Sequence, residues 1–518
     1  MKKKPVAAIA LTLAVYILFL LALTAAESSC PGSGIRSFWD ALWYSVVTIT
    51  TVGYGDLYPV SPAGKAIGAF FLLLSVGALA FAVSFIYAAM TGRFIPRIRL
   101  FLGRHKPWYV FSEANDASAA LARDIARREP DSLIVFAASS SAPGIPDAVC
   151  LPESLPDAHL AGGKAYTAFF MSGDARKNSD DALTVMEEKC PPTRIYCMGE
   201  GSAPLPGVQE FDPFTCCARQ YWQAYPLSPE EQNVVIAGSG KYARALLSQA
   251  LLALCRAPFA ASTYHLFGDW SEYKRRHPLL CSALEKPQDG AVKDMLVFHD
   301  QPWNGDIALL ESADRIIFCE DEEAENARCA GMLERLYAHS AGVYVRTASR
   351  FVSGVRFGHP QDVFTAEMVM NQALDKAAIA MHETYRSAAS GDVPAWETLS
   401  SFLKASNRAA ADHMLTKARL LLPGEDVRAL TPDTCRRTYE AYISGGEPLR
   451  SLCRENEHER WMRFHQYYNW QYASQRDNAM RRHPSLVPFA SLNEAEQAKD
   501  DHAWQLLASF SVRSEEHV

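Results

Sequence analysis

The chain has 518 residues, of which 21% are charged and 49% are apolar, and its formal net charge is -7 at pH 7. This length suits about three or four domains of globular composition, so any membrane portion is a minority of the chain. The acidic balance argues against nucleic acid as the main partner, because neutralising phosphates requires a basic face. The 12 cysteines show no paired C-x-x-C spacing, which favours reduced thiols.

The first apolar run, from Pro5 to Ala26, has two interpretations. It carries no charge and follows Lys2, Lys3 and Lys4, a pattern typical of a membrane helix and of a cleavable signal peptide. The run is long enough to cross about 30 Å of hydrocarbon, whereas the apolar core of a signal peptide is about half as long. We therefore favour a retained outer helix.

The next informative stretch, Thr48 to Asp56, reads T-I-T-T-V-G-Y-G-D. It contains a TVGYG run, formed by Thr51, Val52, Gly53, Tyr54 and Gly55. In such a run the backbone carbonyls of four chains replace the hydration shell of a potassium ion. The two glycines accept positive φ, which lets successive carbonyls turn toward one axis. Without its context, V-G-Y-G would fit a glycine-rich turn equally well.

A short amphipathic helix is predicted just before this run. Ser37 is its N-cap, and Asp40 follows three positions later as in a capping box. The C-terminal end of the helix carries a partial charge of about half a negative unit. It would face the cavity below the ion-selecting TVGYG run, the filter, and favour a cation there.

With this helix, the TVGYGD sequence and the apolar segment that follows, residues 35–92 resemble the pore of a prokaryotic two-transmembrane potassium channel. The resemblance implies a homotetramer with K⁺ held at Thr51, Val52, Gly53 and Tyr54. It also implies that Trp43, Tyr44 and Asp56 support the filter, although Tyr44 departs from the Trp that is commoner at its position.

The second apolar segment, Pro62 to Met90, is rich in small residues, which let membrane helices approach closely. Gly77 falls in its middle and is either a gating hinge or a packing glycine. Five basic residues follow the segment, namely Arg93, Arg97, Arg99, Arg104 and Lys106. By the positive-inside rule they and the N-terminal lysines put both termini in the cytoplasm.

Alternating strands and helices begin near Lys106 and predict a parallel sheet covered on both faces. The strands expected for residues 107–227 are Trp108 to Phe111, Ser132 to Phe136, Ala165 to Phe170, Arg194 to Cys197 and Val208 to Phe211, with helices at Ala114 to Arg128 and near Asp180 to Glu188. The first turn, Phe111 to Asn115, carries no G-x-G, so we expect a structural or regulatory unit without a dinucleotide.

A second unit is predicted over residues 228–350. Its first strand, Asn233 to Ala237, turns through Gly238-Ser239-Gly240 into a helix from Arg244 to Leu254, the G-x-G-x-x-A context of a phosphate-binding turn. The next strand ends near Asp269, where an acidic residue would meet a ribose hydroxyl. Gly238, Gly240 and Asp269 are therefore candidate nucleotide-binding residues; a merely tight turn is the alternative.

Two Rossmann-like units after a two-span pore resemble the tandem RCK domains of ligand-gated potassium channels. The resemblance implies a cytoplasmic ring of eight units whose expansion pulls on the inner helices through the linker, residues 93–106. The acidic run Glu320 to Glu323 with Glu325 could hold a divalent cation, but such a run is more typical of the first turn of a helix.

Past about residue 360 the pattern is helical, with a connector at 351–395 and a domain at 396–518. The expected helices are Thr365 to Ser387, Ala395 to Leu422, Leu449 to Tyr468 and one near Ser491 to Phe510. The passage Asn456 to Met462 lacks the second His of a zinc-binding H-E-x-x-H. With His483 to Phe489 it resembles the ryanodine-receptor-type (RyR) repeat domain.

Ligand contacts in this domain are expected from six residues: Asn407, Arg408, Arg460, Trp461, Trp470 and Arg476. Arginines of this set could contact phosphates, and the tryptophans could stack on a base. The alternative is that the tryptophans are core and the arginines pair with Glu457 and Asp412.

The sequence thus predicts a membrane α-helical pore followed by α/β Rossmann-like domains and a mostly α-helical C-terminal domain. We expect a homotetrameric, ligand-gated potassium channel of a bacterial inner membrane, in contact with lipid and regulated by a small molecule such as an adenine nucleotide or NAD. The alternatives are a membrane-anchored nucleotide-dependent enzyme and a ligand-binding scaffold that does not conduct. Against an enzyme, the sequence shows no cluster of nucleophile, base and orienting residue.

Overall fold

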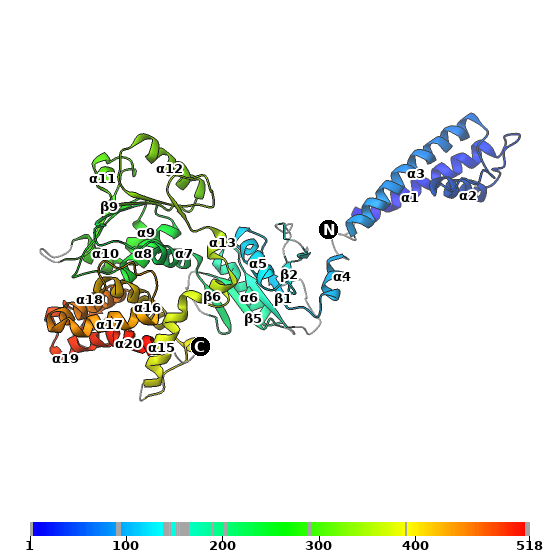
Figure 1. The fold of residues 1–518 in the computed structure, drawn as a ribbon. Helices are drawn as coiled ribbons and strands as arrows, with labels where there is room; N and C mark the ends of the chain where they lie inside the picture. The colour runs from blue at the N-terminus through cyan, green and yellow to red at the C-terminus, as the bar shows by residue number, and fades with distance from the viewer. Residues whose placement is uncertain are drawn as a thin grey trace. The chain divides into compact units, whose positions relative to one another are not determined.

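The computed structural model describes residues 4–89, 95–137, 144–145, 147–151, 153, 155, 165–188, 191–199, 205–286, 292–388 and 391–512. It has two compact units, residues 1–103 and residues 104–518 (Figure 1). Lys2, Lys3 and Arg93, together with the start of the predicted linker, lie outside the described residues.

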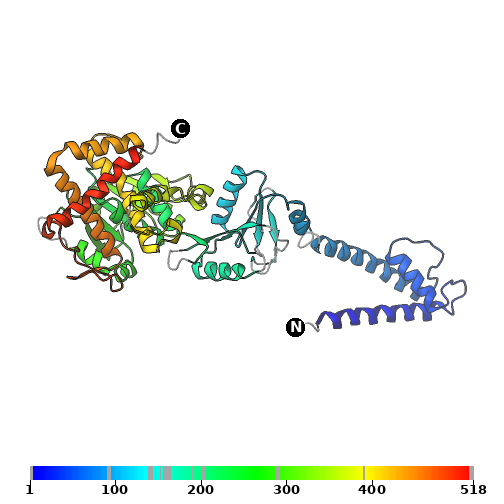
Figure 2. The ribbon, with the colours of Figure 1, turned by 90° about the horizontal axis from the view of Figure 1, so that it is seen from below.

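Helices α1 (Lys4–Glu27), α2 (Phe38–Ile49) and α3 (Pro62–Ala89) build the first unit. α1 and α3 lie side by side and α2 packs against both (Figure 1, Figure 2). None of these helices, as far as the structure describes their residues, combines the length and the apolar composition that crossing a bilayer needs. The two spans predicted from the sequence stay predictions. Helix α4 (Ile95–Leu102) lies where the sequence predicted a linker.

The predicted capping box at the start of α2 is confirmed. The Ser37 hydroxyl accepts from the Asp40 amide at 3.3 Å, and the Asp40 carboxylate accepts from the Ser37 amide at 2.8 Å. These bonds satisfy amides that have no partner within the helix, and they fix the residue at which α2 begins.

The second unit begins with a six-stranded parallel sheet. Its elements are β1 (Trp108–Phe111), α5 (Asp116–Arg128), β2 (Leu133–Ala137), β3 (Val149–Leu151), β4 (Tyr166–Phe170), α6 (Ala175–Met186), β5 (Arg194–Met198) and β6 (Val208–Phe211). The strand order is β3-β2-β1-β4-β5-β6, the order of a doubly wound fold whose direction reverses between β1 and β4. β1 is buried at every position, as a central parallel strand covered on both faces must be.

A second six-stranded parallel sheet repeats this arrangement. Its elements are β7 (Asn233–Ala237), α8 (Lys241–Ala253), β8 (Thr263–Phe267), α9 (Ser271–Arg276), α10 (Pro278–Glu285), β9 (Met295–His299), α11 (Ile307–Ser312), β10 (Arg315–Phe318), α12 (Glu323–Leu336), β11 (Gly342–Arg346) and β12 (Val355–Phe357). The order β12-β11-β10-β7-β8-β9 places the reversal between β7 and β10. Both predicted Rossmann-like folds are therefore present.

One buried asparagine in a helix of each Rossmann-like unit, in α6 and in α12, makes the same three hydrogen bonds. Asn178 accepts from the Ser172 amide at 2.8 Å and donates to the carbonyls of Ser172 and Met198 at 2.9 and 2.7 Å. Asn326 accepts from the Glu320 amide at 2.7 Å and donates to the Glu320 and Arg346 carbonyls at 2.9 and 3.0 Å. Each asparagine thus joins the end of the fourth strand of its unit to the end of the fifth.

The chain returns to the first sheet after completing the second. The joining elements are α7 (Pro213–Ala224), α13 (Pro360–Val363) and α14 (Ala366–Val369). α7 packs on α8, and α13 and α14 pack on α5. Gln209 donates to the Val369 carbonyl at 2.9 Å, and the Ala366 amide donates to Asp124 at 2.9 Å. Residues far apart in sequence therefore hold the two sheets together.

The rest of the second unit is helical. Its elements are η3 (Ala373–Asp375), α15 (Lys376–Ala388), η4 (Trp396–Thr398), α16 (Ser401–Leu421), α17 (Pro432–Ser444), α18 (Gly446–Tyr467), β13 (Gln471–Tyr472), β14 (Arg482–His483), η5 (Phe489–Ser491), α19 (Glu494–Gln497), η6 (Ala498–Asp500) and α20 (Asp501–Val512). Trp504 is fully buried in its core, donates to the Cys453 carbonyl at 2.8 Å and stacks on Tyr442. α16 and α18 also pack on α8 of the second sheet.

Several predicted boundaries differ from the structure. The second sheet extends past residue 350, because β12 pairs with β11. The helix expected from Thr365 to Ser387 is interrupted where Gln372 adopts a φ of 46°, a left-handed conformation that ends a helical run. β3 and α17 were missed: β3 has three residues at a sheet edge, too short for a periodic signal.

Replacing Asn178 with Leu should lower the thermal unfolding temperature of the second unit. The substitution leaves the Ser172 amide and two strand-end carbonyls without partners, at a cost of about 1–3 kcal/mol for each buried group. Thermal unfolding of the purified full chain, followed by tryptophan fluorescence, measures the effect. Asn371→Leu is the control, because Asn371 is exposed; an equal change in both variants would contradict the assigned role.

Candidate functional site

The filter residues follow directly on the C-terminal end of α2. Thr51, Gly53 and Gly55 have φ values of 59°, 59° and 74°, so every second residue is left-handed. This is the conformation predicted for the two glycines. The same conformation at Thr51 was not predicted, because a β-branched residue rarely adopts it.

The polar backbone groups of the filter divide into two sets. The amides of Val52 and Gly53 both donate to the Val47 carbonyl, at 3.0 and 3.2 Å. Among the described residues, no hydrogen bond reaches the carbonyls of residues 51–55. The amides are thus held by α2, and the carbonyls are available to a ligand.

Trp43 lies beside the filter, as the sequence predicted. Its indole Nε1 donates to the Asp56 carboxylate at 2.9 Å, and its ring stacks on Tyr54 with centroids 6.0 Å apart. Tyr44 instead points at α3, where a Cβ on Gly68 would come within 2.7 Å of its hydroxyl. Trp43 and Asp56 therefore contact the filter segment, whereas Tyr44 joins α2 to α3.

Glu27 at the end of α1 was not singled out from the sequence. It is fully buried, and its carboxylate accepts from the Val60 amide at 3.0 Å, the Ser61 amide at 2.9 Å and the Ser61 hydroxyl at 2.6 Å. A Cβ on Gly64 would overlap this carboxylate. The sequence signal was a lone carboxylate at the end of an apolar run, which could cap the helix that starts at Pro62.

Gly77 lies in α3, and no atom of the described residues comes within 4 Å of the position that a Cβ would take. It therefore differs from Gly64 and Gly68, whose missing side chains make room for Glu27 and Tyr44. Both interpretations of Gly77, hinge and packing glycine, stay predictions.

The glycine turn of the second Rossmann unit lies at the switch point between β7 and β10. Gly238 has a φ of 132°, and a Cβ there would come within 2.9 Å of the backbone that joins Cys319 to Glu320. Asp269, which follows β8, donates its amide to the Ser239 hydroxyl at 3.0 Å. The fold thus brings together Gly238, Gly240 and Asp269, the three candidate nucleotide residues.

A cavity of about 640 Å³ opens beside this turn, at the carboxyl ends of β7, β8, β9 and β10. Its side chains are mainly aromatic or acidic: Phe267, His299, Trp303, Phe318, Asp300, Glu320, Asp321, Glu322 and Glu325. Glu323 and Glu325 lie in the first turn of α12, as predicted for the acidic run. No group of three or more metal-binding side chains occurs in the part of the chain that the structure describes.

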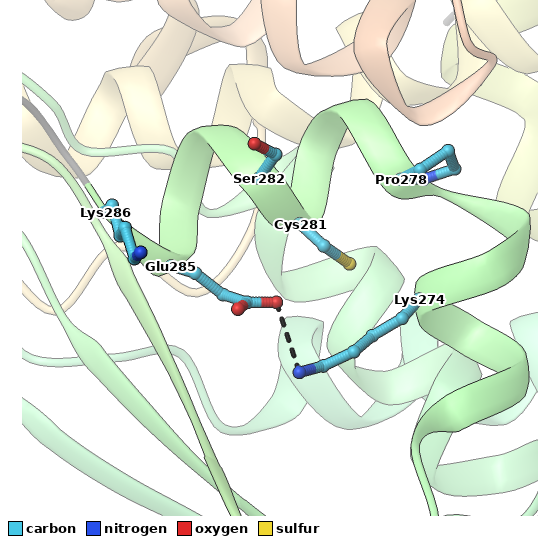
Figure 3. A pocket seen from close by; sticks show the side chains of 6 residues that line it. All are labelled: Lys274, Pro278, Cys281, Ser282, Glu285 and Lys286. Carbon is cyan, nitrogen blue, oxygen red and sulfur yellow. Dashed lines mark ion pairs between the residues drawn. The ribbon is translucent and has the colours of Figure 1, made fainter.

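A smaller cavity of about 350 Å³ lies against α9 and α10 (Figure 3). Lys274 forms an ion pair with Glu285 at 3.2 Å, and its ammonium group lies 3.7 Å from the centre of the Phe298 ring. Burial raises the pKa of Cys281 to about 11, so its thiol stays protonated at neutral pH. The lysine is already paired and the thiol is unreactive, which makes this cavity a weak candidate.

The candidate ligand residues of the C-terminal region are mostly engaged within the chain. Arg460 is buried and donates to Glu457 at 2.5 Å, the predicted alternative. Arg408 pairs with Asp375 at 2.6 Å and not with Asp412. Asp412 instead accepts from Arg219 of α7 at 2.7 Å, which sequence reasoning missed.

The other candidates divide by exposure. Trp470 is buried and stacks on Phe402 with centroids 5.6 Å apart, and Trp461 lies over His465 at 4.0 Å. Asn407 is half-buried and donates to the Leu403 carbonyl at 2.9 Å, and Arg476 is exposed and donates to Asn478 at 2.9 Å. The structure does not gather the six residues at one site, and a ligand role for them stays a prediction.

The two RyR-like passages contact each other and the second sheet. His458 Nε2 bonds the Val487 carbonyl at 2.8 Å, which joins the passages. Burial alone would lower the pKa of His458, but bonds to Asp500 and to this carbonyl hold the pKa above its usual value. Arg463 pairs with Asp294, just before β9, at 2.6 Å with both side chains buried.

Three side chains of the helical region cap the C-terminal end of α8. Thr416 donates to the Ala253 carbonyl at 2.7 Å, His413 Nε2 bonds the Cys255 carbonyl at 2.9 Å, and Asn456 donates to Cys255 and Ala257 at 3.1 and 2.7 Å. Carbonyls at a helix end have no partner within the helix, so these bonds replace water. The same α8 begins at the glycine turn, and it therefore connects that turn with the helical region.

Two family models match parts of the chain. An ion channel family model matches residues 8–92, and a RyR domain model matches residues 445–510. These matches confirm both resemblances, to a channel pore at one end and to a RyR domain at the other. Neither model describes an enzyme.

Potassium channels resemble the chain over short segments. A voltage-gated potassium channel of Aeropyrum pernix is 55% identical over 49 residues, which are 10% of this chain and 17% of the relative. The potassium voltage-gated channel protein shk-1 of Caenorhabditis elegans is 42% identical over 72 residues, 14% of this chain and 13% of the relative. The chain spans less than a fifth of the length of these relatives.

Two solved structures of the GsuK channel show a weaker likeness. A mutant form is 17% identical with a TM-score of 0.35, over 70% of this chain and 97% of the other. The NAD-bound form is 14% identical, also with a TM-score of 0.35, over 72% of this chain and 84% of the other. At these values the likeness carries no argument about the present chain.

Gly64→Ala should destabilise the first unit, because the new methyl group displaces the Glu27 carboxylate from its bonds to Val60 and Ser61. The expected cost is about 1–3 kcal/mol, as for overpacking of a buried site. Thermal unfolding of the detergent-purified protein measures it. Gly331→Ala is the control, because Gly331 is also helical but has nothing within 4 Å; no loss for Gly64→Ala would show that the contact is not stabilising.

Stability should fall between about pH 6.5 and pH 4, in part through His413. Burial lowers the pKa of His413 to about 4. The Glu457 carboxylate, 3.7 Å away, acts in the opposite direction but does not offset the effect of burial. Over this range His413 binds a proton in the unfolded chain but not in the folded chain. At the low end of the range this difference lowers the free energy of unfolding by about 3 kcal/mol.

Unfolding midpoints of the wild type and His413→Gln, measured across this pH range, test the effect. The variant should lose less stability on acidification. His502→Gln, at an exposed position, should follow the wild type. Identical pH dependence in all three proteins would assign the acid sensitivity to other groups.

Proposed function

We propose that the chain is one subunit of a homotetrameric, ligand-gated potassium channel of a bacterial inner membrane, with both termini in the cytoplasm. The observation that carries the proposal is the filter backbone, with positive φ at Thr51, Gly53 and Gly55 and with carbonyls that no described residue bonds. Four such segments around one axis would offer rings of oxygens in place of the hydration shell of K⁺.

The surroundings of the filter support this function. α2 ends at the filter, so its C-terminal dipole, about half a negative charge, would favour a dehydrated cation in the cavity below. Trp43 holds Asp56 and Tyr54 from the side. Such contacts would resist collapse of the carbonyl rings when an ion leaves.

Gating would begin in the cytoplasmic part of the chain. α8 is bonded at one end to the loop after β10 and at the other end to α16 and α18. Gln249 of α8 shares the Asp412 carboxylate with Arg219 of α7, which follows the first sheet. A ligand that moves α8 would therefore act on both Rossmann units, and the linker would pass the movement to α3 and its Gly77.

The regulatory ligand would be an adenine nucleotide or NAD, bound near Gly238, Gly240 and Asp269 or in the RyR domain. It must bind the open and closed states with different affinity, because equal affinity shifts no equilibrium. A tenfold change in the open-to-closed ratio needs about 1.4 kcal/mol of difference.

Potassium flux into liposomes that hold the purified full chain tests the proposal. Selective K⁺ flux is expected, and ADP, NAD or another member of a nucleotide panel should change its rate. Gly53→Ala should abolish the flux, because alanine resists the positive φ that the filter requires.

Gly32→Ala is a matched control, since Gly32 also has positive φ and open space around it but lies outside the filter. This variant should conduct like the wild type. Absence of flux from the wild type under every condition would refute the channel function and favour a non-conducting scaffold.

A further inference from the structure

The loop from Cys319 to Glu322 joins β10 to α12 and lies on the glycine turn. The Ser239 amide donates to the Glu320 carboxylate at 3.2 Å, and the Tyr242 amide donates to the Asp321 carboxylate at 3.3 Å. A Cβ on Gly240 would overlap the Asp321 carboxylate. Gly240 is the N-cap of α8 and supplies no side-chain cap, so Asp321 bonds an amide of the first turn from the loop after β10.

These amides are the donors that a nucleotide phosphate would use. A phosphate binds a glycine turn through its backbone amides and through the positive end of the following helix dipole. A carboxylate satisfies the same amides and the same dipole. Glu320 and Asp321 therefore occupy, in charge and in position, the place of a phosphate.

The loop is held firmly at this place. Arg346, at the end of β11, is buried and donates to the Glu320 carbonyl at 3.0 Å and to the Asp321 carbonyl at 2.6 Å. Asn326 bonds both the amide and the carbonyl of Glu320. The guanidinium of Arg346 also lies 4.0 Å from the ring centre of Tyr242, in the first turn of α8. Loop and helix are thus fixed to each other.

The charge of the adjoining cavity acts in the same direction. Five carboxylate residues occur among the described residues that line it, and none of these is a lysine or arginine: Asp300, Glu320, Asp321, Glu322 and Glu325 carry the acid groups. The nearby guanidinium groups of Arg346 and Arg244 already bond loop and turn carbonyls. A phosphate that enters this space is therefore repelled by the carboxylates.

We propose that Glu320 and Asp321 form an internal plug that closes the glycine turn of the second Rossmann unit to phosphate-bearing ligands. A nucleotide reaches Gly238 and Gly240 only after the plug is neutralised or withdrawn. The inference rests on the proposed function in which a nucleotide regulates the channel. It assigns to these two carboxylates the exclusion of nucleotides from the turn while the plug is in place.

Isothermal titration of ADP and of NAD into the detergent-purified full chain tests the plug. The wild type is compared with Glu320→Gln/Asp321→Asn, which keeps the side-chain shapes but removes their charge. Glu320→Ala/Asp321→Ala removes charge and volume. The neutralised variant should gain at least tenfold in affinity at one site per chain, and the truncated variant at least as much.

Glu322→Gln is the matched control, because Glu322 lines the same cavity and is the N-cap of α12 without a side-chain cap bond. It loses one carboxylate charge of the same cavity, against two in each double variant, and should bind like the wild type. In each double variant, Asp269→Asn should weaken the gained site, which separates it from a site in the RyR domain.

Three results would contradict the proposed plug. These are a wild-type affinity at this site equal to that of the neutralised variant, no gain of nucleotide affinity in either double variant, or an equal gain of affinity in Glu322→Gln. Thermal unfolding of each variant shows whether it is folded, and Asp321→Asn alone replaces a double variant that is not. Potassium flux is measured on the same proteins. Loss of wild-type flux would refute the proposed channel and leave the binding comparison valid.

Discussion

Both ends of helix α8 must be satisfied by other parts of the chain, and the arrangement of the second unit depends on this requirement. A helix leaves amides unpaired at its start and carbonyls unpaired at its end, and buried polar groups without partners are costly. Asp321, from the loop after β10, bonds an amide at the start. Thr416 and Asn456, from the RyR-like region, bond carbonyls at and just after the end. One helix of the second sheet therefore fixes the position of elements that lie far away in sequence.

Buried ion pairs also lie within the helical region and between it and the second sheet. Lys417 pairs with Glu457 at 2.8 Å and Arg463 with Asp294 at 2.6 Å, and all four side chains are nearly inaccessible to solvent. Burial by itself raises the pKa of Glu457, but Arg460 and Lys417 hold it well below its ordinary value. Such pairs add little net stability compared with apolar packing, but removing one partner leaves the charge of the other buried and unpaired. The pair of Arg463 with Asp294 links α18 to the residue before β9, whereas Lys417 with Glu457 joins α16 to α18.

The TVGYG segment shows how far sequence reasoning reaches for a backbone conformation. Gly53 and Gly55 could be assigned positive φ because glycine alone adopts it freely. The bond from Trp43 to Asp56 joins residues thirteen apart, one within α2 and one beyond its C-terminal end. Glu27 escaped notice because two of its three bonds come from the backbone amides of Val60 and Ser61, which leave no trace in the residue types.

The sequence by itself determined the positive-φ glycines of the TVGYG segment, the two Rossmann-like units and the glycine turn after β7, because periodicity and glycine act locally. Only the tertiary structure decided what occupies that turn, since Glu320 reaches Ser239 across eighty-one residues through the pairing of β10 with β7. Tertiary packing also decided that Arg460 pairs with Glu457 inside the domain and that Arg219 pairs with Asp412. The residue type determines which bonds a side chain can make, and the fold determines which partner it meets.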